Sequence, residues 1–175
     1  MESLELLSDA FERVLSEVEH VLEGLKAEDL AWQPRPDCSS IGWLSWHLAR
    51  EQDSAISYLM KKDQLWIMEG WNERYGRPAD PRDIGTGHSL EEAGAFRSPD
   101  IQVILDYHRA VLGRIKEYLR SLTSQDLDRV VNVRYLPPLT TVGTFLISIV
   151  ADGMGHAGQM GYVRGIRQGI GWQKY

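Results

Sequence analysis

The sequence predicts an all-α protein built as a bundle of four long helices. Four segments of roughly twenty residues carry apolar side chains at three- and four-residue spacing, the pattern of an amphipathic helix. Stretches rich in proline, glycine and serine separate these segments. The stretch VVNVRY at residues 130–135 has a strand-like composition but is too short to build a sheet. Four helices with one apolar face each predict an antiparallel four-helix bundle.

Length and composition narrow the class of protein further. The chain has 175 residues, of which 43% are hydrophobic and 25% charged, so we expect one domain over residues 1–175. The net charge is −6 and no lysine or arginine cluster stands out, which argues against a nucleic-acid partner. The single cysteine excludes an intrachain disulfide framework and a cysteine-rich zinc site. An acidic, amphipathic start and the lack of a long apolar window predict a cytoplasmic protein with no membrane partner.

The first two helices follow from their apolar stripes. We expect the first over residues 3–25, and its stripe consists of Leu4, Leu7, Phe11, Val14, Val18, Val21 and Leu25. A loop rich in proline and serine comes next, and Ser39 or Ser40 then offers an N-cap for a second helix over about 40–62. The inner face of this helix consists of Ile41, Leu44, Leu48, Ala55 and Leu59.

A long irregular insert is expected between the second and third long helices, at residues 63–99. It starts as an aromatic, helical continuation, passes through a loop rich in proline and glycine, and contains a capping box from Ser89 to Glu92 for a short helix. A connection of this length in a small domain is more typical of a lid or binding loop than of a plain linker.

The third and fourth long helices complete the bundle. Ser98 as N-cap and Pro99 in the first helical position predict a helix that runs to about residue 121. Its stripe consists of Ile101, Ile104, His108, Val111, Ile115 and Tyr118. Thr140 or Thr141 is expected to cap a last helix over about 141–167. The stripe of this helix consists of Val142, Phe145, Ile149, Asp152, His156, Met160 and Val163.

Two polar residues interrupt the last stripe at positions that should be apolar. Asp152 and His156 are four residues apart, so their side chains share one helix face. Burying a carboxylate and an imidazole costs several kcal/mol unless they are paired or bound to a cation. Gly153, Gly155 and Gly158 surround them, and glycine in a helix interior indicates close approach of a neighbouring helix or a ligand.

The second helix supplies a third candidate ligand, His47, at the edge of its inner face. Two imidazoles and one carboxylate from two helices can hold a divalent transition metal and leave coordination positions open for chemistry. The alternative is that Asp152 and His156 form a hydrogen-bonded core pair and that His47 is an ordinary core histidine. Both interpretations stay open on the residues alone.

At these residues the sequence resembles the DinB-like superfamily of metal-binding four-helix bundles. That group includes bacillithiol- and mycothiol-dependent transferases and the mycothiol-dependent maleylpyruvate isomerase. The matching pieces are SIGWLSWHLAR at 40–50, LPPLTTVGTF at 136–145 and DGMGHAGQMGYVRG at 152–165. The resemblance covers nearly the whole chain and implies a bundle of up-down-down-up order with a long crossover between its second and third helices.

The resemblance also implies a metal site and a class of reaction. His47 and His156 match two of the family's three histidine ligands, and Asp152 stands where the third histidine is found. A divalent transition metal such as Zn, Ni, Fe or Mn is expected, and the carboxylate shifts the preference toward the harder Mn and Fe. The implied function is transfer of a low-molecular-weight thiol to a small electrophile. A metal-dependent hydrolase and a non-enzymatic, stress-induced metal-binding bundle are the alternatives, and family members often form homodimers.

Three further residues each allow two interpretations. Glu51 lies four residues after His47 and is either a fourth ligand, a partner of a ligand or a general base, or else a solvated helix charge. His108 is either a catalytic group facing the substrate or a core histidine bonded to Tyr107 or to the backbone. Arg164 either binds an anionic group of the thiol cofactor or forms a salt bridge at the surface or a dimer interface.

Overall fold

The protein is an all-α bundle, as the sequence predicts. The computed structural model describes residues 2–133, 137–138 and 140–173. Four long helices form the bundle: α1 (Ser3–Leu22), α3 (Ile41–Met60), α7 (Ile101–Arg120) and α8 (Val142–Gln168). Within the described residues, β-pairing is limited to one isolated bridge between Val130 and Thr141, and two residues of the VVNVRY stretch, 134 and 135, lie outside that part.

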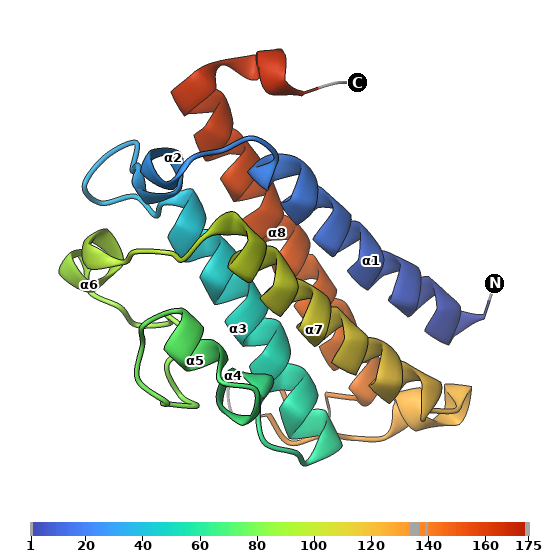
Figure 1. Cartoon of the computed structure of the whole chain (residues 1–175). Helices are drawn as coiled ribbons and strands as arrows, with labels where there is room; N and C mark the ends of the chain where they lie inside the picture. The colour runs from blue at the N-terminus through green and yellow to red at the C-terminus, as the bar shows by residue number, and fades with distance from the viewer. Residues whose placement is uncertain (1, 134–136, 139, 174–175) are drawn as a thin grey trace.

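The four helices have the up-down-down-up order (Figure 1). Helices α7 and α8 each pack on both α1 and α3, so α1 and α3 lie at opposite corners of the bundle. Helices α1 and α8 run in one direction and α3 and α7 in the other. Because α3 and α7 are parallel, residues 61–100 must return along the length of the bundle before α7 begins.

The shorter elements lie in the connections. They are α2 (Ala27–Ala31), α4 (Leu65–Met68), α5 (Trp71–Arg74), α6 (Leu90–Ala95) and the 3₁₀ turns η1 (Ser124–Asp128) and η2 (Ile170–Trp172). The expected continuation of α3 into the aromatic segment does not form, since Lys61 adopts a left-handed conformation (φ 54°) that ends the helix. Three separate short helices therefore occupy the segment between α3 and α7.

Most of the predicted caps are present. The Ser40 hydroxyl accepts a hydrogen bond from the Trp43 amide, and the Thr141 hydroxyl accepts one from the Thr144 amide. The capping box of Ser89 and Glu92 opens α6. The prediction for α7 was wrong by two residues, because the Asp100 carboxylate accepts from the Gln102 amide at 2.8 Å and is the N-cap in place of Ser98.

Helix α3 differs from its neighbours because it is buried on nearly every side. The five predicted inner residues are buried, and so are polar residues that a surface helix would expose. Those polar residues are Ser45, His47, Arg50, Gln52, Asp53 and Ser57. Residues 61–100 pack over the outer face of α3, which Figure 1 shows as the green segment containing α4, α5 and α6.

The rotation of α8 corrects one expectation. Its buried line passes through Gly153 and Ala157, while the Asp152 side chain is 42% exposed and that of His156 is 18% exposed. A β-carbon on Gly153 would lie 3.1 Å from Val14 of α1, so glycine at this position lets α8 pack closely against α1. Asp152 and His156 therefore sit at the edge of α8 and not in the bundle centre.

The prediction of close approach at three glycines holds at one of them. At Gly153 a β-carbon would meet Val14 and the Gln52 amide, both at 3.1 Å. At Gly155 and Gly158 a β-carbon would meet no protein atom within 4 Å, so no neighbouring helix approaches these two glycines closely. A search of the described helices finds none with the length and apolar character needed to span a bilayer.

Candidate functional site

Two histidine–carboxylate pairs meet where α3 packs against α8. On α3, His47 Nε2 lies 3.8 Å from Glu51 Oε1, and on α8, His156 Nε2 lies 3.5 Å from Asp152 Oδ1. Each pair spans four residues, and the two helices are antiparallel. His47 therefore faces His156, with ring centroids 4.7 Å apart, and Glu51 lies opposite Asp152, close enough for a protonated Glu51 to donate a hydrogen bond to the Asp152 carboxylate. We call these four side chains the seam group.

Both imidazoles of the seam group are held through Nδ1. His47 Nδ1 is hydrogen-bonded to the backbone oxygen of Ile84, and His156 Nδ1 lies 2.9 Å from Gln159 Oε1. The backbone oxygen of Ile84 only accepts hydrogen bonds, so the neutral His47 ring carries its proton on Nδ1 and leaves the lone pair on Nε2. Trp43 stacks on His47 with ring centroids 4.8 Å apart and fixes the plane of that ring.

The carboxylates of Glu51 and Asp152 lie close together in the half-buried seam group and repel each other when both are charged. Burial, together with the nearby charge of Asp152, raises the pKa of Glu51 to about 7. The hydrogen bond to His156 holds the pKa of Asp152 below its ordinary value although burial acts in the other direction. The same bond raises the pKa of His156, whereas burial lowers the pKa of His47. A cation bound between these groups would relieve the repulsion of the two acids.

A small pocket opens beside the two acids. Its volume is about 190 Å³, and its lining consists of Glu51, Ser54, Ala55, Ile84, Phe145, Ser148, Ile149 and Asp152. The walls are mainly apolar, two serine hydroxyls add polar contacts, and the carboxylates lie at one side. A pocket of this size and character accommodates a small group of a few heavy atoms.

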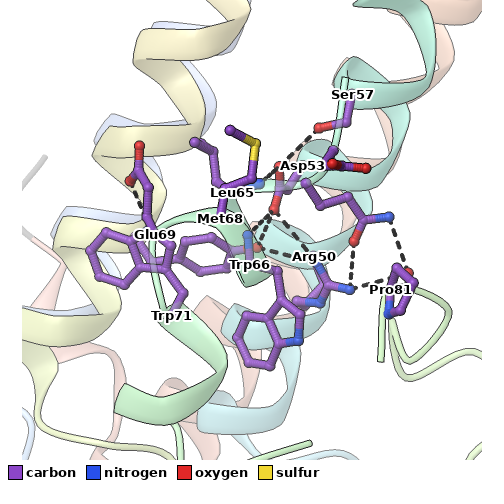
Figure 2. A network of polar contacts seen from close by, with 12 residues as sticks. Arg50, Asp53, Ser57, Leu65, Trp66, Met68, Glu69, Trp71 and Pro81 are labelled. Carbon is purple, nitrogen blue, oxygen red and sulfur yellow. Dashed lines mark hydrogen bonds and ion pairs between the residues drawn. The ribbon is translucent and has the colours of Figure 1, made fainter. Parts of the chain in front are cut away.

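A buried ion pair on α3 lies behind the seam group, and sequence reasoning missed it (Figure 2). Arg50 and Asp53 are fully buried and lie 3.6 Å apart. The Asp53 carboxylate accepts hydrogen bonds from the backbone amides of Leu65 and Trp66, at 3.0 and 2.8 Å, and from the Tyr107 hydroxyl at 2.8 Å. Asp53 thus fixes the start of α4 against α3.

Arg50 holds the other end of the same segment. Its Nε donates to the Asp83 carbonyl at 3.1 Å, and its Nη2 donates to the Pro81 carbonyl at 3.3 Å. In sequence, Arg50 and Asp53 resemble an exposed pair on the polar face of a helix. One signal in the sequence could have indicated that the outer face of α3 is covered. Residues 63–76 are rich in aromatic side chains, and these need another surface of the protein against which to be buried.

His108 is placed apart from the seam group. Its side chain is buried, and Nε2 lies 3.0 Å from the hydroxyl of Ser45 on α3. Burial lowers the pKa of His108 to about 4, so the ring is neutral near pH 7. The position matches the interpretation of a core histidine, with Ser45 as its partner in place of Tyr107 or a backbone group.

Arg164 is also placed apart from the seam group. Its guanidinium donates to the carbonyls of His20 and Val21 at 3.2 and 2.7 Å and stacks over the Trp172 ring at 4.6 Å. These carbonyls belong to the last turn of α1, so Arg164 caps that helix. It lies roughly 12 Å along α8 from His156 at 1.5 Å per residue.

The seam group fits a divalent transition metal in its donor types. Two imidazoles with Nδ1 bonded to oxygen and two carboxylates are ligands that such metals accept. As the side chains stand, however, no three His, Cys, Asp or Glu residues in the described part of the chain are arranged to hold a metal ion. The side chains pair with one another, and metal binding would have to draw them together.

Comparison with known proteins identifies the family. The model of the DinB superfamily matches residues 10–160, and the chain therefore belongs to this superfamily. The fold is similar to the crystal structure of a conserved protein from Enterococcus faecalis, with a TM-score of 0.85 and 30% sequence identity. That match covers 95% of this chain and 97% of the other. A search of curated proteins gave no match.

Proposed function

We propose that this protein is a metal-dependent enzyme that acts on a small molecule at the seam group. His47, Asp152 and His156 are the proposed ligands of one divalent metal, such as Zn, Ni, Fe or Mn. The observation that carries the proposal is the meeting of two histidine–carboxylate pairs, one from each of two facing helices, at the side of a small pocket. Homodimer formation and a cytoplasmic location remain predictions.

The chemistry we propose is transfer of a low-molecular-weight thiol to an electrophile. When bound, a divalent metal lowers the pKa of a thiol or water that it holds. Glu51 lies beside the pocket and is the residue that takes the thiol proton. The sulfur then forms a bond to the electrophilic carbon, and the leaving group departs with its bonding electron pair.

The lining of the pocket supports a small electrophile. Phe145 and Ile149 on α8 and Ala55 on α3 form apolar walls that exclude water from a reacting group. The hydroxyls of Ser54 and Ser148 supply hydrogen bonds that orient it. At about 190 Å³ the pocket is too small to enclose a thiol cofactor and its acceptor together, so most of the cofactor would lie outside it.

Hydrolysis is the second candidate reaction. The same position of Glu51 beside the pocket suits a general base that takes a proton from water. In that case no thiol is consumed, and an ester or amide bond is cleaved. A bundle that binds metal without turnover is the third possibility, and one experiment separates all three.

The experiment compares metal-free protein with protein reloaded with Zn, Ni, Mn or Fe. Thiol consumption is followed with a panel of electrophiles, and release of acid from esters and amides is followed without thiol. We expect metal-dependent thiol consumption that falls by roughly 10²–10⁴ in Glu51→Gln, since a general base contributes that much. Glu117→Gln, at the exposed surface of α7, is the matched control. Turnover without thiol would favour the hydrolase, and bound metal without turnover would overturn the enzymatic proposal.

A further inference from the structure

We infer that residues 81–88 form a clamp that presets the imidazole of His47, and that Arg50 and Gly85 are positioning residues of this clamp. The inference rests on the proposed function in one respect, since it gives the preset ring the role of a metal ligand. The clamp itself is argued from hydrogen bonds and close contacts that do not involve a metal.

The clamp is anchored on α3 by a fully buried guanidinium. Arg50 donates from Nε to the Asp83 carbonyl and from Nη2 to the Pro81 carbonyl, and Figure 2 shows the contact with Pro81. A second bond from Nη2 to Gln64 Oε1, at 2.9 Å, directs this side of the guanidinium toward the segment. The rigid guanidinium of Arg50 therefore holds the carbonyls of Pro81 and Asp83, which precede Ile84 by three residues and by one residue.

A second set of contacts fixes the same segment from the outside. The Asp83 carboxylate accepts from Arg77 at 2.7 Å and pairs with His88 Nε2 at 3.0 Å. His88 Nδ1 in turn accepts from the indole N–H of Trp43 at 3.1 Å. Because Trp43 also stacks on His47, the clamp and the ring are tied to the same indole.

Gly85 allows the segment to lie directly against the ring. Its φ is +91°, which disfavours any residue with a β-carbon. A β-carbon there would lie 2.9 Å from both Trp43 Cζ2 and Trp46 Cζ3, and 3.2 Å from His47 Nδ1. Glycine is required at this position for the carbonyl of Ile84 to reach His47.

The result is one defined state of the His47 ring. The Ile84 carbonyl selects the tautomer with the proton on Nδ1, and Trp43 sets the ring plane. Nε2 then points toward Glu51 and the facing ring of His156. His47 is therefore preorganised by the protein, and binding energy need not be spent on orienting it.

The test reads the tautomer directly by ¹⁵N NMR of the histidine side chains at pH 8 in metal-free protein. We expect His47 with Nδ1 protonated in the wild type and a mixture of tautomers in Gly85→Ala. Gly87→Ala is the matched control, because Gly87 also has a positive φ (+87°) in the same segment but a β-carbon there would meet nothing within 4 Å. This control should keep the wild-type tautomer.

Zn²⁺ affinity is measured on the same proteins by competition with a chelating dye. We expect Gly85→Ala to lose about 10–100-fold in affinity, the usual effect of losing the partner that orients a ligand. Gly87→Ala should stay within a factor of about 3 of the wild type. Arg50→Lys keeps the charge but cannot reach both carbonyls, and it should shift the tautomer in the same direction as Gly85→Ala.

Two results would overturn the inference. One is a wild-type protein in which His47 is protonated on Nε2, and the other is a Gly85→Ala protein with unchanged tautomer and unchanged Zn²⁺ affinity. Failure of the proposed function has a different signature. In that case no protein of the series binds Zn²⁺, while the tautomers still differ between Gly85→Ala and Gly87→Ala.

Discussion

The two halves of the seam group have the same chemistry in different surroundings. On α3, the His47 side chain is 8% exposed and is fixed by the stack on Trp43 and by the clamp, through the carbonyl of Ile84. On α8, His156 is 18% exposed and bonds to Gln159, while the Asp152 side chain is 42% exposed. One half is therefore preset and the other is free to adjust.

The difference follows from what covers each helix. Residues 61–100 pack over the outer face of α3, whereas the outer face of α8 remains open to solvent near the seam. A rigid ligand beside an adaptable pair is a useful combination for a metal site. In the proposed metal site, the rigid half would set the position of the ion and the adaptable half would close on it.

The largest expected effect concerns the support behind the rigid half. Asp53→Asn removes one charge of a fully buried pair that also caps α4, and it should lower the free energy of unfolding by about 3–5 kcal/mol. Asp152→Asn on the open half should change it by less than about 1 kcal/mol. Chemical denaturation at pH 7 measures the free energy of unfolding of both variants. Equal losses in the two variants would contradict the difference between the two halves.

A second effect separates the core histidine from the seam histidines. In the unfolded chain histidine titrates near pH 6.5, but buried His108 has a pKa of about 4 in the fold. Between these values the unfolded state binds more protons, so stability falls as the pH is lowered from about 6.5 to 4 and levels off below that.

The size of this loss is up to about 1.4 kcal/mol per pH unit, or roughly 3 kcal/mol over the window. His108→Gln can bond to Ser45 but does not titrate, so its stability should fall by that much less between pH 7 and 4. Denaturant unfolding across this range measures both proteins. Parallel pH profiles would show that His108 is not held neutral.

A third prediction compares the two histidines of the seam group without metal. His47→Ala loses the bond to Ile84 and the stack on Trp43, and it should cost about 1–2 kcal/mol of stability. His156→Ala should cost less than about 0.5 kcal/mol, since its partners are exposed. Thermal unfolding in the presence of a chelator checks this order, and a larger loss of stability in His156→Ala than in His47→Ala would contradict it.

The smallest expected effect lies within α8. Gly155→Ala should stabilise the protein by about 0.5–1 kcal/mol, because alanine favours the helix and its β-carbon meets nothing within 4 Å. Gly153→Ala should destabilise it, because the new carbon would press on Val14 at 3.1 Å. Stabilisation by both substitutions would contradict the close packing of α8 on α1.

Local signals predicted the helices well, and the site less completely. The caps at Ser40 and Thr141 depend on a few neighbouring residues and were predicted as possible caps, and the four-residue spacing correctly placed Glu51 on the face of His47. The rotation of α8 depends on how closely Gly153 approaches another helix, which spacing within one helix does not encode. That is why Asp152 and His156 were expected in the core but lie at its edge.

Contacts across long sequence separations account for the rest. Arg50 is buried because carbonyls more than thirty residues later bind it, as its bond to Asp83 shows. Arg164 was considered for binding an anion because of its spacing from His156, but it caps α1 at the other end of the chain. In both cases the partner is a backbone carbonyl, which no side-chain motif reveals.

The central claim is that the seam group holds one divalent metal, and metal content tests it most directly. Untagged protein is incubated with Zn, Ni, Mn and Fe in turn, freed of unbound ions and measured by mass spectrometry. His47→Ala and His156→Ala are compared with His20→Ala, a histidine of α1 outside the seam group. We predict about one equivalent of metal in the wild type and in His20→Ala, and its loss in the other two. A wild type without metal, or seam variants that retain it, would contradict the account.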